Sequence, residues 1–165
     1  MRPQKIIDSV QQFSQVLGEG VFSTQEATYT ENDAIRALIE PLKQIRSNGK
    51  RVYLIGNGGS AAIAAHICID LLNVGKISAQ VLHEAPQLTC FSNDYSYEQG
   101  LSKQLEIMAQ AGDMLIAISS SGSSQNIINA AKVAQQKNMT LVTLTGFESD
   151  NFLRQQGSWN YWLDS

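Results

Sequence analysis

Charged residues are scarce in this 165-residue sequence: Asp, Glu, Lys and Arg make up 16% of it, against roughly 25% in an average globular domain. Lys and Arg number 12, Asp and Glu 15, and the net charge is −3. Because no cluster of Lys or Arg is present, a protein that binds nucleic acid through its phosphates is not expected. Apolar residues reach 43%, and a small net charge with so many apolar residues argues against a disordered chain.

Long apolar runs are also missing. No run approaches the ~20 residues of a transmembrane helix, so no membrane partner is predicted. The first residues, MRPQKIIDSVQQF, lack the apolar segment of a secretory signal peptide. The two cysteines, Cys68 and Cys90, lie in apolar contexts without metal-site spacing. They are predicted to be buried free thiols of a cytoplasmic protein.

Strands and helices are predicted to alternate over residues 47–165. Short apolar runs, typical of buried strands, lie at 52–55, 79–82, 114–118, 140–144 and 159–163. Helical apolar spacing is present at 60–72, 97–110, 124–137 and 151–156. The helix at 60–72 is apolar almost all round, which is typical of a helix buried against a sheet. This alternation predicts one α/β domain with a mainly parallel sheet.

Residues 1–46 are predicted to form two helices outside this alternation. The apolar stripe of the first helix comprises Ile6, Val10, Phe13 and Leu17. The second stripe, over 35–45, follows a helix cap at Asn32 or Asp33 and contains Pro41, which is expected to kink it. Either stripe could pack on its own domain or form an interface between copies, and the pattern does not choose between them.

Two strand–loop–helix junctions carry the polar residues best suited to chemistry. The first has the loop G-N-G-G-S at 56–60, and the second has S-S-S-G-S-S at 119–124. Each falls inside a stretch without Asp, Glu, Lys or Arg, 52–69 and 114–131. Ligands of open α/β sheets bind where strands end, and a helix N-terminus offers unpaired N–H groups to an anion. Glycines allow close backbone approach, and serines add hydroxyl donors.

These loops predict a phosphate site rather than a nucleotide site. Neither is a G-x-G-x-x-G fingerprint or a P-loop, which requires G-K-[ST]. A single Gly/Ser loop is equally well explained as a plain turn. Five serines within six residues, directly before a helix, favour phosphate binding at the second junction.

Together with N-D-Y at 93–95, the two loops resemble the sugar isomerase (SIS) domain family, most closely its phosphoheptose isomerases. The motifs occur in the family's order and spacing, from about residue 30 to the end. The resemblance implies a three-layer sandwich with a flavodoxin- or Rossmann-like sheet, and a homotetramer to which the helices of residues 1–46 contribute. It also implies ketose–aldose isomerisation of sedoheptulose 7-phosphate or a similar phosphorylated sugar.

The resemblance assigns roles by position. The phosphate is assigned to Ser119, Ser120, Ser121 and Ser124. The sugar is assigned to Asn57, Gly58, Gly59 and Ser60 of the first loop, with Asn93 and Asp94 binding its hydroxyls. Without the resemblance, the Asn93–Asp94 dipeptide would be interpreted as a turn or a helix cap.

His66 and Asp70 are the candidate catalytic pair. At i, i+4 they share one helix face and are the only ionisable groups on that helix. Isomerisation needs an acid and a base, and burial would move both pKa values toward neutrality. A helical His–Asp pair near an exposed end explains them equally well.

The resemblance makes His66 a possible zinc ligand and Asp70 both a ligand and the catalytic base. The family has Glu at the position of Asp70, so the carboxylate is one methylene shorter here. A misplacement of about 1 Å can cost ~100-fold in rate.

A second departure concerns the C-terminus. The family has a further helix with a catalytic His, whereas this sequence ends at Ser165, after its last predicted strand. The domain is therefore expected to lack that helix, and His83 lies in the wrong part of the pattern to replace its His. These departures leave two other interpretations open: a non-catalytic, regulatory sugar-phosphate-binding module, and a tetramer that binds a replication initiator.

Overall fold

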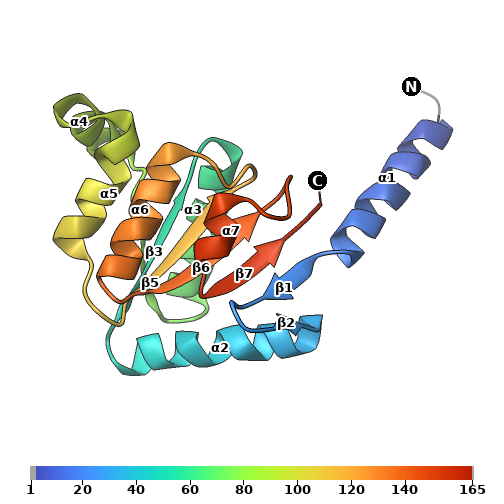
Figure 1. Ribbon diagram of the computed structural model, residues 1–165, viewed down its shortest axis with the longest axis horizontal. Helices are drawn as coiled ribbons and strands as arrows, with labels where there is room; N and C mark the ends of the chain where they lie inside the picture. Colours follow the sequence, from blue (N-terminus) through green and yellow to red (C-terminus); the bar gives the residue numbers. More distant parts are fainter. Residues whose placement is uncertain (1–2, 165) are drawn as a thin grey trace.

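The computed structural model describes residues 3–164, arranged around one seven-stranded sheet (Figure 1). The strands are β1 (Val21–Ser23), β2 (Thr28–Tyr29), β3 (Arg51–Gly56), β4 (Ser78–Val81), β5 (Met114–Ser119), β6 (Thr140–Thr145) and β7 (Trp159–Trp162). The helices are α1 (Pro3–Gly18), α2 (Glu31–Ser47), α3 (Gly59–Asn73), α4 (Ala85–Asp94), α5 (Tyr97–Met108), α6 (Gln125–Gln136) and α7 (Phe152–Gln156). Among these helices, none has the length and apolar character needed to cross a membrane.

The sheet has the order β2-β1-β7-β6-β5-β3-β4. Strands β4, β3, β5, β6 and β7 are parallel, whereas β1 runs antiparallel to both β7 and β2. From β3 the chain first moves outward to β4, then returns past β3 to build the other side from β5. The boundary between β3 and β5 is therefore the topological switch point, where open α/β sheets bind their ligands. The predicted mainly parallel α/β sheet is confirmed.

Helices cover both faces of this sheet, which gives the predicted three layers. Buried residues of α5, α6 and α7 pack on one face, with Leu105, Ile127 and Leu153 fully enclosed. On the other face, α2 and α3 contribute Ile45 and Ala64 to the second core.

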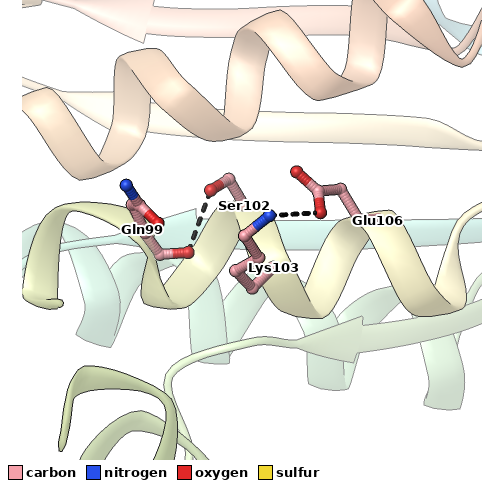
Figure 2. A network of polar contacts seen from close by, with 4 residues as sticks. All are labelled: Gln99, Ser102, Lys103 and Glu106. Carbon is pink, nitrogen blue, oxygen red and sulfur yellow. Dashed lines mark hydrogen bonds and ion pairs between the residues drawn. The ribbon is translucent and has the colours of Figure 1, made fainter. Parts of the chain in front are cut away.

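Helix α5 shows how one helix divides between core and solvent. It buries Leu101 and Leu105, as its apolar spacing predicts. Figure 2 shows the ion pair between Lys103 and Glu106 on the same helix, with 2.8 Å between Nζ and Oε2. The buried Ser102 hydroxyl donates a hydrogen bond to the Gln99 carbonyl at 2.9 Å, which satisfies its polar group without breaking the helix (Figure 2).

The N-terminal segment differs from the prediction of two helices alone. Strands β1 and β2 lie between α1 and α2, and β1 joins the main sheet beside β7. They have three and two residues, too short for an alternating pattern to be recognised. Helix α2 is capped by Thr30, whose hydroxyl accepts the Asp33 N–H at 3.4 Å, so a cap at Asn32 or Asp33 was wrong. The helix continues through Pro41.

Three further expectations are corrected. Helix α4 was not predicted at all; it has no buried residue and no apolar stripe to reveal it. Helix α3 is not buried all round, because only Ala64 and Cys68 are enclosed while Ile63 and Ile69 are more than half exposed. Of the two free thiols, Cys68 is buried but Cys90 is exposed.

Asp113 fixes the start of the two central strands. Its carboxylate, 4% exposed, accepts the backbone N–H of Arg51 at 2.9 Å and that of Gln110 at 2.8 Å. A buried N–H that loses its partner costs about 1–3 kcal/mol.

Replacing Asp113 with Ala should therefore lower the free energy of unfolding by about 2 kcal/mol or more, because two backbone donors lose their acceptor. Urea denaturation followed by circular dichroism measures the difference. Asp150→Ala, which removes an exposed carboxylate, is the matched control and should change stability by less than about 0.5 kcal/mol. Equal stabilities of the two variants would contradict the role given to Asp113.

Candidate functional site

Two helix N-termini meet at the switch point. Strand β3 is paired with β5 up to its last residue, Gly56, which lies opposite Ile118. Helix α3 begins at Gly59 and helix α6 at Gln125, so the two predicted loops lie side by side at one edge of the sheet. The first N–H groups of each helix and the positive ends of both dipoles therefore face the same region, which suits an anion.

The serine loop lines a cavity of about 230 Å³ at this edge, here called the serine cavity. Its walls are Asn57, Ser60, Ile118, Ser119, Ser120, Ser121, Ser124 and Phe147. The four serines predicted to hold phosphate, and Ser60 of the first loop, are thus brought together. The two apolar walls, Ile118 and Phe147, were not foreseen, because Phe147 comes from the loop after β6.

Hydroxyl groups, not cations, provide the polar surface of the serine cavity. No Lys or Arg belongs to the set of described residues that line it. The Ser121 hydroxyl accepts hydrogen bonds from the backbone N–H and the hydroxyl of Ser123, at 3.3 and 3.0 Å. Ser124 precedes α6, but its hydroxyl does not cap the helix and lies 3.4 Å from that of Ser119. Because the hydroxyls of Ser121 and Ser124 accept these bonds, their own protons can turn to a ligand.

The Gly122 backbone shapes the loop. Gly122 has a φ of +61°, and a Cβ at this position would overlap the side chain of Asn151. The Leu153 N–H donates to the Gly122 carbonyl at 3.1 Å, and the Gly146 N–H donates to Ser120 at 2.8 Å. The loop is thus held from behind by the chain around α7.

An amide pair joins the two loops. Asn57 donates to Asn126 at 3.0 Å, and Asn126 donates back at 2.8 Å. The Tyr97 hydroxyl also donates to the Asn57 carboxamide oxygen, at 2.9 Å. Asn126 is 3% exposed. Sequence reasoning missed Asn126 and Tyr97, because nothing in their local pattern shows that they meet a loop some 40 to 69 residues earlier.

A second cavity, of about 190 Å³, lies on the other side of Asn57 and is here called the histidine cavity. It is lined by Gly56, Asn57, Gly58, Ala61, His83, Leu88, Tyr97 and Leu101. Asn57 and Gly58 thus lie where the sugar was predicted, while Gly59 lines neither cavity. His83, which sequence reasoning set aside, is one of the walls.

Asn93 and Asp94 are not brought to either cavity. They are exposed at the end of α4, where the Asn93 amide donates to the Asp94 carboxylate at 3.0 Å. Among the described residues of a single chain, no contact supports the prediction that they bind sugar hydroxyls.

His66 and Asp70 share one face of α3, as predicted, with 3.6 Å between Nε2 and Oδ2. Their side chains are 78% and 60% exposed. The expectation that this pair is buried is therefore wrong for the single chain, because the sheet side of α3 is taken by Ala64 and Cys68. Neither residue lines the serine cavity or the histidine cavity.

The zinc ion that the resemblance implied does not fit this pair alone. Structural zinc sites have four protein ligands and catalytic ones three. Across residues 3–164, no group of three or more His, Cys, Asp or Glu side chains gathers to hold a metal.

Replacing Gly122 with Ala should destabilise the serine loop more than a positive φ alone explains, because Asn151 must move away from the new methyl group. Gly49→Ala is the matched control: Gly49 has a φ of +64° but open space around its Cβ direction, so it should cost about 1–2 kcal/mol. Gly122→Ala should cost at least about 1 kcal/mol more. Chemical denaturation of both variants measures this, and equal losses would contradict the Asn151 contact.

Comparison with known proteins agrees with this geometry. The SIS domain family model matches residues 19–146. The phosphoheptose isomerase of Shewanella denitrificans is 39% identical over 137 residues, which cover 75% of this chain and 70% of that protein. The phosphoheptose isomerase structure from Francisella tularensis matches with a TM-score of 0.83 at 26% identity, over 100% of this chain and 87% of that one. The structure from Neisseria gonorrhoeae matches with a TM-score of 0.67 at 27% identity, over 95% and 84%. The chain belongs to the SIS domain family.

Proposed function

We propose that this chain is a cytoplasmic phosphosugar isomerase that interconverts ketose and aldose forms of sedoheptulose 7-phosphate or a similar sugar phosphate. The observation that carries the proposal is the serine cavity between two helix N-termini. The family relatives, which are named phosphoheptose isomerases, supply the reaction class. The unpaired thiols Cys68 and Cys90 fit a reducing compartment.

Phosphate binding at this cavity rests on neutral donors. The hydroxyls of Ser119, Ser120, Ser121 and Ser124 and the N-terminus of α6 would share the charge of the phosphate. The sugar would extend from the phosphate past Asn57 toward the histidine cavity. Asn57 is held in one orientation by Asn126 and Tyr97, so the wall that separates phosphate from sugar is fixed before the ligand arrives.

The reaction moves one hydrogen between neighbouring carbons. A base removes the proton from C1 of the ketose, the C–H electron pair forms the C1=C2 bond, and the C2=O π pair moves to the C2 oxygen. The proton is then returned to C2 while the C1 hydroxyl loses its proton, which passes to the C2 oxygen, and becomes the aldehyde carbonyl. We assign the base to Asp70, with His66 as its partner 3.6 Å away. Because both side chains are exposed in one chain and line neither of its cavities, this assignment requires that a second copy of the chain enclose them and place its own cavities against them.

A homotetramer would provide that enclosure. Helix α1 projects from the body of the domain (Figure 1), and its apolar side chains at positions 6, 7, 10, 13 and 17 are between 49% and 63% exposed. On α3, Ile63, Ile69 and Leu72 lie exposed on the helix that carries His66 and Asp70. Apolar surface of this extent on a small domain is typical of an interface.

Charged substitutions on α1 test whether this helix forms the interface of the tetramer. The double substitution Val10→Glu/Phe13→Glu should split the tetramer into smaller species, because two carboxylates would be buried in the interface without partners. Gln11→Glu/Gln12→Glu adds the same charge at polar positions of α1 and should leave the assembly intact. Light scattering coupled to gel filtration measures the mass. A wild-type protein that runs as a monomer would refute the proposed assembly.

Activity separates the roles of serine and aspartate. With sedoheptulose 7-phosphate as substrate, Ser121→Ala should raise KM about 10- to 150-fold, because one hydrogen bond to a charged group such as phosphate is worth about 1.5–3 kcal/mol. Asp70→Asn should lower kcat by at least about 100-fold with KM nearly unchanged, because it removes the base and leaves the phosphate site intact. Aldose product is followed by chromatography.

Ser149→Ala is the control for the serine substitution, since this exposed serine lies outside both cavities. Tight binding of the substrate without turnover by the wild-type protein would contradict the isomerase function and favour a sugar-phosphate-binding module. Unchanged KM in Ser121→Ala would contradict the phosphate role of the serine cavity.

A further inference from the structure

The histidine cavity contains one ionisable imidazole, that of His83, to which the proposed reaction assigns no role. His83 follows β4, which is paired with β3 at the edge of the sheet. Its imidazole lines the cavity together with Gly58 and Ala61 of the first turn of α3. His83 therefore lies at the same strand ends as the two loops, although it is far from their motifs in sequence.

One nitrogen of this half-buried imidazole lacks a well-formed hydrogen bond. Its Nδ1 is enclosed, and no partner for it exists among the described residues. A buried polar atom without a partner costs about 1–3 kcal/mol, so its retention calls for an explanation. The torsion about the Cβ–Cγ bond is roughly two-fold, so a flip of the ring exchanges its two edges. An oxygen in the cavity could therefore satisfy either ring nitrogen.

The surroundings favour a neutral imidazole. Burial lowers the pKa of His83, against smaller opposing effects from the Glu84 charge and from a weak hydrogen bond with the Ala61 backbone. The N-terminus of α3, with its positive dipole end, lies beside the ring and acts in the same direction as burial. A neutral imidazole beside a helix N-terminus keeps an N–H with which it can polarise a carbonyl.

The two cavities together have the size of one ligand site. At about 230 and 190 Å³, each is smaller than the roughly 300–1,000 Å³ of typical ligand pockets, and their combined volume falls within that range. Asn57 is a wall of both. A sugar phosphate whose phosphate lies in the serine cavity can therefore extend past Asn57 and place its other end in the histidine cavity.

We propose that His83 is a further substrate-contacting residue, which hydrogen-bonds the oxygens at the carbonyl end of the sugar while the phosphate occupies the serine cavity. This inference rests on the proposed function. The imidazole donates its N–H to the carbonyl oxygen and keeps its proton. As the base removes hydrogen from C1, negative charge grows on that oxygen, and the hydrogen bond stabilises it.

Nuclear magnetic resonance can observe His83 directly, because the chain has two histidines and His66→Asn leaves one imidazole signal. Sedoheptulose 7-phosphate should shift the His83 signals, whereas inorganic phosphate, which occupies the serine cavity alone, should leave them nearly unchanged. A His83 signal that sedoheptulose 7-phosphate does not move would overturn the proposal. Equal shifts with both ligands would overturn it too, since they would report a change in the loops rather than a contact.

Kinetics provide the second measurement. His83→Ala should lower kcat/KM about 100-fold, mainly through kcat. His83→Asn, whose amide can still donate, should recover part of the loss. Both variants should bind inorganic phosphate like the wild type, which shows that they are folded. Wild-type kcat/KM in His83→Ala, or no recovery in His83→Asn, would refute the contact.

The two measurements also separate this inference from the function on which it rests. Binding of sedoheptulose 7-phosphate that shifts His83 without any turnover would overturn the isomerase function and leave the His83 contact standing. Turnover of sedoheptulose 7-phosphate that leaves the His83 signal unmoved would overturn the His83 contact and leave the isomerase function standing.

Discussion

The pairing of β3 with β5 is the constraint on which the site depends. This pairing is the topological switch point of the parallel strands, on either side of which the strand order runs in opposite directions. It places the two loops and the two helix N-termini next to each other. Helices α2 and α3 cover one face of this pair, and α5 and α6 cover the other. The Asn57–Asn126 amide pair then joins the loops across the gap. The groups assigned to the phosphate follow from this one adjacency, and the pairing of β4 with β3 adds His83 beside them.

The sequence predicted most of what local periodicity controls. Each strand of the parallel sheet was placed within one or two residues. The central strands β3, β5 and β6 were the clearest, because apolar runs that are largely buried contrast sharply with their flanks. The serine loop was found for the same reason, since it directly follows such a run. Helix α4 and strands β1 and β2 were missed because they are short or exposed and carry no periodic signal.

Tertiary proximity was beyond the reach of those patterns. His66 and Asp70 have the spacing of a functional pair, but only the packing of α3 shows that they point away from the sheet. His83 has no motif around it, and only the return of the chain through β4 brings it to the first turn of α3. The resemblance to known isomerases identified the loops well, whereas residues particular to this chain had to be found from contacts.

The lack of cations in the serine cavity affects how a ligand arrives. Lys and Arg side chains project a field over about one Debye length, about 8 Å at physiological ionic strength, and so attract anions from a distance. Hydroxyls and helix ends act only at contact, and the chain as a whole carries a charge of −3. Capture of a phosphorylated sugar is therefore governed by random encounter, and its rate should vary little with salt. Such a cavity selects the anion after it has entered, by fit and by the number of donors.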